Sequence, residues 1–333
     1  MTDNTSNSRR NLWNHHPPLP IPDTPVFQWP PRVVDALKWM TNRWVNISAS
    51  MLFLAVAVLV FQFAAIPLDT MASLKPGWVF HVWLRNVFLL LLFAGGLHFW
   101  LFTVSGQGNR FKYDAEPLKR NSKRFTFRNQ VYDNLFWTLT SGVGAMTFFE
   151  VLYWWAAAND VAPVMTFAGA EIWFVVWIFA LPIVGSTHFY WIHRFLHWPP
   201  VYRKVHILHH RSTNIGPWSG ISMHPVESVL YMSDLLIHFL VPTHPVIFLL
   251  HLYVKGIGPA FTHSGFETVA VGNTRLVGAG DFHHQLHHRF FDCNYGTADT
   301  PWDRWFGTFH DGTAEATQRV REYQQKKRGR VKP

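Results

Sequence analysis

The sequence predicts an all-α fold: an integral membrane helical bundle with about four transmembrane helices, a re-entrant or interfacial hairpin, and a cytosolic histidine-rich cap that binds metal. Of the 333 residues, 17% are aromatic and only 15% are charged. The apolar residues gather into runs of about 20, the length that a helix needs to cross a hydrocarbon core. Three histidine clusters follow the last such run, which predicts the cap.

The first 46 residues precede the bundle. Residues 1–33 contain seven prolines, which lack an N–H and restrict their predecessors, so we expect an extended arm. Residues 34–46 have the pattern of an interfacial amphipathic helix, with Trp39 and Trp44 at headgroup depth.

The membrane-spanning helices are predicted from the apolar runs. The predicted spans are residues 47–67, 86–104, 135–157 and 172–192. Residues 226–258 are also apolar, but Pro242 and Pro245 divide them into halves too short to cross singly. We therefore expect the re-entrant or interfacial hairpin there.

Basic residues predict the orientation. The 105–130 loop contains seven Lys and Arg, the 68–84 connection contains one, and the 158–171 connection contains none. Because Lys and Arg favour the cytoplasmic side, both termini and the metal site are predicted to be cytoplasmic, at a bacterial inner membrane or the endoplasmic reticulum. The net charge of +9 lies beside apolar runs, which indicates contact with anionic lipid rather than with nucleic acid. The single cysteine, Cys293, excludes an internal disulfide.

Three histidine clusters predict a metal site. His193 and His197 are four residues apart, and the spacing H-x-x-H-H occurs at 206–210 and again at 284–288. On a helix, positions i, i+3 and i+4 share a face, so each cluster is expected to direct its imidazoles at one point. A helix from Glu171 to His197 would be about 40 Å long, which places the first pair at the membrane edge.

The number of imidazoles predicts two metal ions. Eight exceed the four ligands of a structural zinc and the three of a catalytic zinc. Imidazole binds iron, copper, zinc and nickel, so ligand type alone does not choose the metal. A site at the membrane edge without an H-E-x-x-H motif or a phosphate loop favours iron and the oxidation of a lipid C–H bond.

These motifs resemble the three histidine boxes of the membrane fatty acid hydroxylase and sterol desaturase superfamily. The boxes are H-R-F-L-H at 193–197, H-I-L-H-H at 206–210 and H-Q-L-H-H at 284–288; H-P-V-E at 224–227 and W-D-R-W-F-G-T-F at 302–309 also match. The resemblance covers about residues 181–309. It implies two iron ions, for which zinc can substitute in a purified sample, O2 as co-substrate, and no catalytic residue beyond the metal ligands. The implied ligands are His193, His197, His206, His209, His210, His284, His287 and His288, with His263 as a ninth candidate and His224 as a tenth.

Composition and the resemblance together divide the chain into four parts, and the resemblance implies a set of partners. We expect an arm and interfacial helix at 1–46, a transmembrane region at 47–180, a fatty acid hydroxylase-like catalytic region at 181–310 and a basic tail at 311–333. The partners would be a membrane, a lipid substrate, and a ferredoxin, rubredoxin or cytochrome b5 type electron donor with its reductase. The basic loop and tail would bind the acidic face of the donor.

The expected reaction is O2-dependent hydroxylation of a lipid, which could be a fatty acyl, sterol-like or related lipid. Desaturation on the same dimetal centre is the alternative, because both reactions begin by abstracting the same hydrogen. A dizinc membrane hydrolase is a more distant alternative, and the absence of H-E-x-x-H argues against it. A metal transporter would place its ligands near the bilayer midplane instead.

Overall fold

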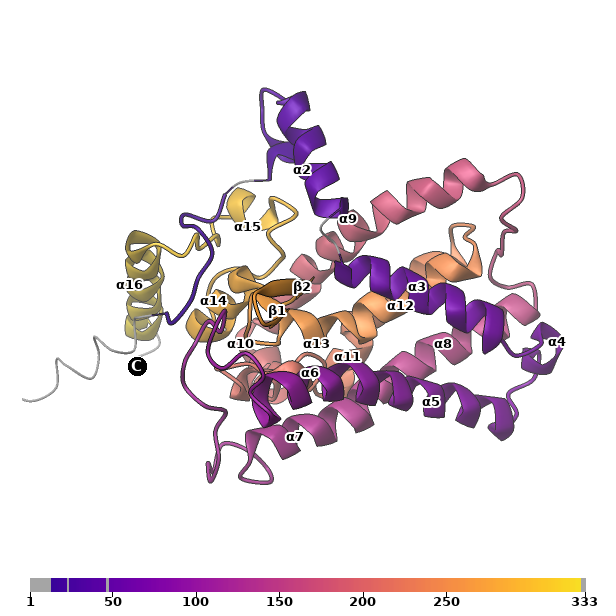
Figure 1. Cartoon of the computed structure of the whole chain (residues 1–333), viewed down its shortest axis with the longest axis horizontal. Helices are drawn as coiled ribbons and strands as arrows, with labels where there is room; N and C mark the ends of the chain where they lie inside the picture. The colour runs from indigo at the N-terminus through magenta and orange to yellow at the C-terminus, as the bar shows by residue number, and fades with distance from the viewer. Residues whose placement is uncertain (1–12, 23, 46–47, 331–333) are drawn as a thin grey trace, which may run out of the picture.

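The computed structural model describes residues 13–22, 24–45 and 48–330. Long helices lie side by side as a bundle, and short helices with one two-stranded sheet cover one end of it (Figure 1). This confirms the all-α membrane bundle with a histidine-rich cap.

Among the described residues, four helical stretches are long and apolar enough to cross a membrane. They are Pro76–Thr103, Gln130–Ala158, Glu171–Leu196 and Pro245–Thr262. The first contains α5 (Pro76–Leu90) and α6 (Gly96–His98), the second α7 (Gln130–Trp137) and α8 (Val143–Ala158), the third is α9 (Glu171–Leu196), and the fourth contains α12 (Pro245–Gly256) and α13 (Gly258–Thr262). Short π-helical segments connect the elements of the first two stretches.

This set of spans differs from the predicted set in two places. The run at 47–67 forms α3 (Ser48–Phe63), which has 16 residues and is short for a span. The second half of the predicted hairpin is instead long enough to cross, because Pro245 and Pro259 stand in the first turns of α12 and α13, where a missing N–H is tolerated. The first half forms α11 (Pro225–Met232) and the 3-10 helix η8 (Ser233–Phe239). Helix α3 packs against α12.

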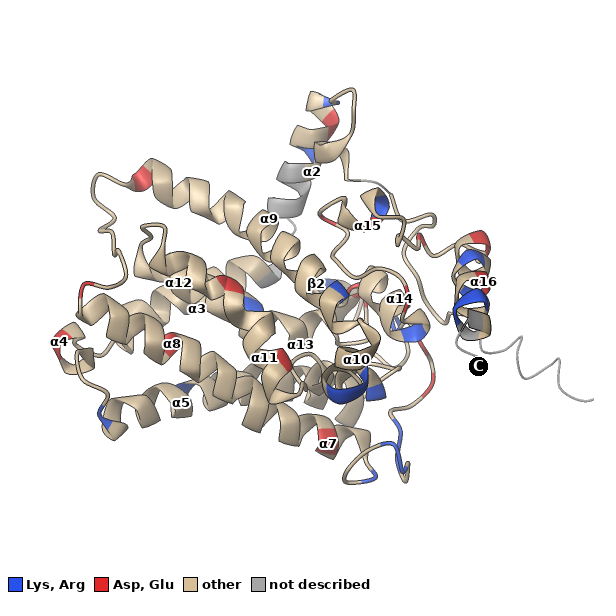
Figure 2. Ribbon diagram, turned by 180° about the vertical axis from the view of Figure 1, so that it is seen from behind, with Lys and Arg blue, Asp and Glu red and all other residues tan. Residues whose placement is uncertain are grey.

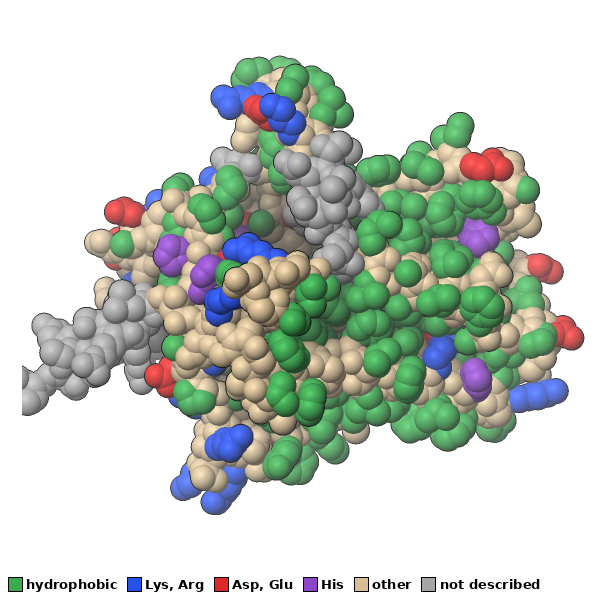
Figure 3. Space-filling view, viewed as in Figure 1, with side chains coloured by type: hydrophobic (Ala, Val, Ile, Leu, Met, Phe, Trp, Pro, Cys, Tyr) green, Lys and Arg blue, Asp and Glu red, His purple; other side chains and the backbone are tan. Residues whose placement is uncertain are grey.

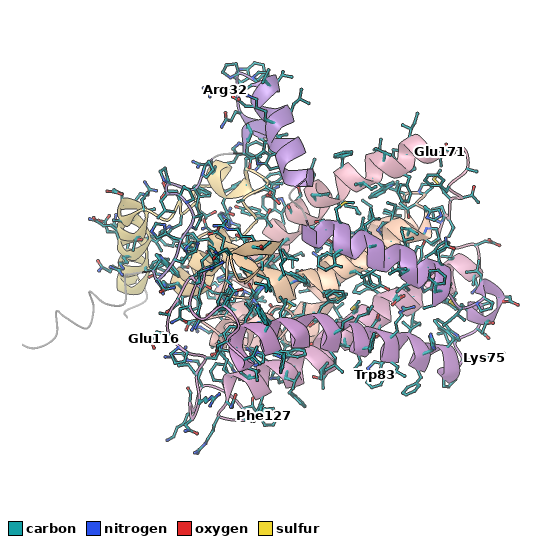
Figure 4. All side chains as sticks on the ribbon, in the orientation of Figure 1. Arg32, Lys75, Trp83, Glu116, Phe127 and Glu171 are labelled. Carbon is teal, nitrogen blue, oxygen red and sulfur yellow. The ribbon has the colours of Figure 1, made fainter. Side chains whose placement is uncertain are left out.

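The outer surface of the bundle is apolar. Hydrophobic side chains cover most of it in the view of Figure 3. On α5, Phe80, Leu84 and Phe88 follow one another at intervals of four residues and are each more than half exposed. Trp83 also projects outward from this helix (Figure 4). Such a surface is suited to lipid contact.

The cap consists of the antiparallel strands β1 (Thr268–Val271) and β2 (Thr274–Gly278) and the helices α14 (Phe282–Phe290), α15 (Trp302–Trp305) and α16 (Ala314–Arg330). The described part of the N-terminal arm lies on this cap. The backbone N–H of Ile21 donates to the carbonyl of Asp311 at 2.8 Å, and the guanidinium of Arg289 stacks 3.4 Å above the ring of Trp13.

Helix α2 (Val33–Val45) has the extent predicted for the interfacial helix and projects away from the bundle in Figure 1. Residues 46 and 47, and the side chain of Trp44, lie outside the described part of the chain. Further short helices are η1 (Pro25–Phe27), α4 (Leu68–Met71), α10 (Pro199–Val201) and η7 (Pro217–Ser219).

Candidate metal centre

Nine histidines converge where α9, α13 and α14 meet the turn after α10. They form two adjacent groups, and within each group the ligand nitrogens lie within 4.8 Å of one another. The first group is His193, His197, His206, His210 and His287; the second is His209, His263, His284 and His288. All are buried except His197, which is half-buried. The structure thus brings together the eight histidines of the three boxes and the ninth candidate, His263.

The imidazoles within each H-x-x-H-H box do not all converge on one point, contrary to the expectation from helical spacing. In the second box, His206 and His210 join the first group while His209 joins the second. This segment is a π-helix, η5 (Tyr202–His206), followed by a 3-10 turn, η6 (His209–Arg211).

In the third box, on α14, His284 and His288 join the second group and His287 joins the first. At 3.6 residues per turn, positions i+3 and i+4 differ by about 100° around the axis, so neighbouring histidines can face different centres. Each of these boxes therefore contributes to both groups.

The spacing of the nitrogens fits metal ions. Two nitrogens bound at about 2.1 Å and at right angles around one ion are about 3.0 Å apart. Five Nε2···Nε2 distances are close to this value: His197–His210 at 3.1 Å, His197–His287 at 3.2 Å, His210–His287 at 3.0 Å, His263–His284 at 3.1 Å and His284–His288 at 3.2 Å. Imidazole groups of this kind suit iron, copper, zinc or nickel.

Backbone carbonyls orient many of these rings. A carbonyl that accepts a hydrogen bond from Nδ1–H leaves the lone pair of Nε2 for a metal. Four rings donate in this way: His193 to Tyr295 at 2.6 Å, His287 to Cys293 at 2.6 Å, His288 to Ser212 at 3.0 Å and His263 to Pro259 at 3.1 Å.

Burial keeps the imidazoles neutral. It lowers the pKa of His209 to about 4 and holds the pKa values of His284 and His288 well below the ordinary value. The neutral form is the one that binds a metal ion.

A buried carboxylate supports the first group. Glu227 Oε1 lies 2.7 Å from Nδ1 of His206, and both side chains are almost fully buried. Burial raises the pKa of Glu227 well above its ordinary value. Glu227 was not among the site residues predicted from the sequence, although the H-P-V-E motif contains it.

His224, the tenth candidate, lies outside both groups. Its Nδ1 accepts a hydrogen bond from the backbone N–H of Val226 at 3.2 Å, so it caps the N-terminus of α11. This hydrogen bond holds the His224 ring at the start of α11, away from the imidazole cluster.

A second carboxylate holds the loop after α14. Asp303 accepts hydrogen bonds from the backbone N–H groups of Tyr295 at 2.8 Å and Gly296 at 2.7 Å. The carbonyl of Tyr295 in turn accepts from His193, so Asp303 acts on the first group through this loop. The W-D-R motif contains Asp303, but nothing in the sequence connects this residue with His193.

A cavity of about 360 Å³ begins at the two groups and runs between α3, α9 and α12. His193, His209 and His284 line one part of it. The remaining wall is largely apolar and includes Phe53, Leu54, Ile178, Leu181, Leu250 and Val254. Both histidine groups therefore lie beside a cavity whose apolar lining suits a lipid chain or ring system.

Comparison with known proteins agrees with this geometry. The family model for fatty acid hydroxylase matches residues 177–308, which include all nine histidines. The predicted resemblance to the fatty acid hydroxylase and sterol desaturase superfamily is thereby confirmed.

Curated relatives match part of the chain. Human lathosterol oxidase is 34% identical over 137 residues, which are 40% of this chain and 45% of that protein. The Delta(7)-sterol 5(6)-desaturase ERG3B of Gibberella zeae is 29% identical over 41% of this chain and 42% of its own length. The Delta(7)-sterol 5(6)-desaturase of Saccharomyces cerevisiae is 34% identical over 36% of this chain and 32% of its own length. The chain thus spans less than half the length of these relatives. No solved structure matches it.

Proposed function

We propose that this chain is a membrane oxidoreductase that holds two iron ions and uses O2 to introduce a double bond into a sterol-like lipid. The observation that supports this most strongly is the pair of imidazole groups beside one apolar cavity. The sequence favoured hydroxylation, but the curated relatives are named for sterol desaturation and lathosterol oxidation. Desaturation, the alternative, therefore replaces hydroxylation as the proposed reaction.

In the proposed reaction one lipid with two adjacent C–H bonds, one O2, two electrons and two protons give one C=C bond and two water molecules. Iron bound by the nine histidines would supply O2 activation and hydrogen abstraction. The chain itself positions the lipid between α3, α9 and α12, and its apolar wall excludes water from the reacting carbons.

An external carrier of the ferredoxin, rubredoxin or cytochrome b5 type would supply the electrons. Lys and Arg gather at the end of the bundle that carries α14 and α16 and along the loop before α7 (Figure 2). This charge would attract the acidic face of such a carrier. His197, the half-buried member of the first group, is the imidazole most accessible from outside the protein.

Turnover of a defined lipid tests the proposal. Iron-loaded protein, a reduced electron carrier and lathosterol in detergent should consume O2 and give a product lighter by two hydrogen atoms, detected by mass spectrometry. A product heavier by one oxygen atom would support hydroxylation instead, and activity that persists without O2 would support a hydrolase. His206→Ala and His284→Ala, which each remove one ligand from a different group, should abolish O2 uptake. A competent preparation that consumes no O2 with any lipid class would contradict the proposal.

A further inference from the structure

A second cluster of ionisable side chains lies beside the same cavity. Lys255 and His251, four residues apart on α12, line the cavity, and Asp234 of η8 lies behind them. All three are buried within the bundle. Charged groups in such a place are costly to bury and indicate a functional site.

The carboxylate of Asp234 organises this cluster. Its Oδ2 accepts from Lys255 Nζ at 3.0 Å and from His251 Nε2 at 3.2 Å. Nδ1 of His251 lies 3.0 Å from Nε2 of His238, whose Nδ1 lies 2.9 Å from the hydroxyl of Thr243. Within the cluster, the carboxylate of Asp234 compensates the charge of the Lys255 ammonium.

Among the described residues, Lys255 and Asp234 still have hydrogen-bonding groups that are not fully used. An ammonium has three donors; Asp234 accepts one of them, and the ring of Tyr231 faces Nζ of Lys255 at 4.0 Å. Asp234 Oδ1 is buried and has no hydrogen-bond partner among the described residues. Gly185 lines the cavity next to this carboxylate, since a Cβ at Gly185 would lie 3.9 Å from Asp234 Oδ2.

The cluster lies a short way from the metal centre along the cavity wall. The ring of Tyr231, which Lys255 contacts, is 5.9 Å from the ring of Phe189, and Phe189 stacks on His193 at 4.8 Å. Two aromatic rings therefore separate the ammonium from the first histidine group. A polar group of a lipid held by Lys255 would fix how far its carbon atoms extend toward the histidines.

We propose that Lys255 and Asp234 bind the hydroxyl group of the lipid that enters the cavity and thereby select the carbon that is oxidised. The ammonium of Lys255 donates to the hydroxyl oxygen, and the hydroxyl donates to the carboxylate of Asp234. A neutral hydroxyl suits a cluster whose carboxylate and ammonium already compensate each other, whereas a lipid carboxylate would leave an uncompensated negative charge in a buried site. This inference rests on the proposed function in taking a lipid as the substrate.

Binding of two matched lipids tests this hydroxyl site without turnover. Radiolabelled lathosterol and its 3-deoxy analogue are bound to purified, metal-loaded protein in detergent. The native protein should bind lathosterol about tenfold or more tightly than the deoxy analogue, because hydrogen bonds to charged groups are among the stronger ones. The double variant D234N/K255M, which removes both charges together, should bind the two lipids about equally.

A matched control removes another buried ion pair. Arg85 of α5 pairs with Glu150 of α8, and neither lines this cavity. R85Q/E150Q should keep the preference for lathosterol, which separates the hydroxyl site from a general loss of buried charge. Size-exclusion chromatography and metal content establish that each variant is folded.

A second variant keeps both charges. Gly185→Val fills the space between the cavity and Asp234 and should also abolish the preference for the hydroxyl. A preference that survives in folded D234N/K255M, or the lack of any preference in the native protein, would overturn the hydroxyl site. A native protein that shows the preference but oxidises no lipid would contradict the proposed function and leave the hydroxyl site standing.

Discussion

At the scale of single residues, Glu227 gives the sharpest test of the first histidine group. It accepts the hydrogen bond from Nδ1 of His206 at 2.7 Å in a fully buried position. Glu227→Ala removes this acceptor. It should lower the affinity of the first histidine group for its metal ion about 10- to 100-fold. Glu227→Gln keeps an acceptor oxygen and should lose less. Metal content after dialysis against graded concentrations of chelator measures the effect.

The control for this prediction is Glu116→Ala, since the side chain of Glu116 is 69% exposed in the loop before α7. It should retain metal as the native protein does. Equal retention in Glu227→Ala and Glu116→Ala would show that the carboxylate does not support the metal centre.

His263 and His224 make a second residue-scale prediction. Nε2 of His263 lies 3.1 Å from Nε2 of His284, whereas the ring of His224 caps α11. His263→Ala should therefore reduce metal content from two ions per chain toward one. His224→Ala should leave metal content unchanged and cost at most about 1 kcal/mol of stability. Elemental analysis and thermal unfolding of the two purified variants separate these outcomes; metal loss in His224→Ala alone would reverse the assignment.

The sequence predicted the convergent histidines far better than the groups behind them. Regular spacing within the boxes identified eight histidines, and the context of His263 identified the ninth. Glu227 acts through its contact with His206, and Asp303 acts on His193 through the loop at Tyr295, which lies 102 residues further along the chain than His193. Spacing along the sequence contains no information about such contacts.

At the scale of elements, the distance between α13 and the turn at residues 217–219 sets the position of His263. A Cβ at Gly220 would overlap the carbonyl group of Pro259, and that carbonyl accepts the hydrogen bond from His263. Gly220→Ala should force the two segments apart, destabilise the fold by about 1–3 kcal/mol and lower metal content.

Gly144→Ala is the matched control on α8, because a Cβ there would meet nothing within 4 Å. It should be neutral or slightly stabilising, since alanine favours a helix more than glycine does. Thermal unfolding and metal analysis of both variants test the pair. A native-like Gly220→Ala protein would show that the close approach at Pro259 is not required.

The helices also show where element prediction fails. The helix from Glu171 to the first histidine pair was predicted almost to the residue, because the helical pattern continues past Pro182 and through the histidines until Trp198 and Pro199. The final span was missed because Pro242 and Pro245 were taken to divide the apolar run into halves too short to cross. In the structure Pro245 and Pro259 each stand at the start of a helix, and the resulting stretch Pro245–Thr262 is enclosed by its neighbours.

At the scale of the whole molecule, the polar and apolar surfaces divide along the bundle axis. Lys75 and Glu171 mark one end in Figure 4, and Glu116 lies at the other end, near the cap. The apolar surface lies between these ends (Figure 3). A membrane would therefore surround the bundle and leave the cap and its histidines at one aqueous face.

The charge distribution predicts on which side of the membrane the cap lies. Basic residues gather on the cap side, so the cap should face the cytoplasm and Lys75 the opposite side. Single cysteines test this, because the native Cys293 is fully buried and should not react. In intact cells a membrane-impermeant maleimide should label Lys75→Cys, and it should label Glu116→Cys only after permeabilisation. The native protein controls for background, and the reverse pattern would place the histidine groups outside the cytoplasm, beyond the reach of a cytoplasmic electron carrier.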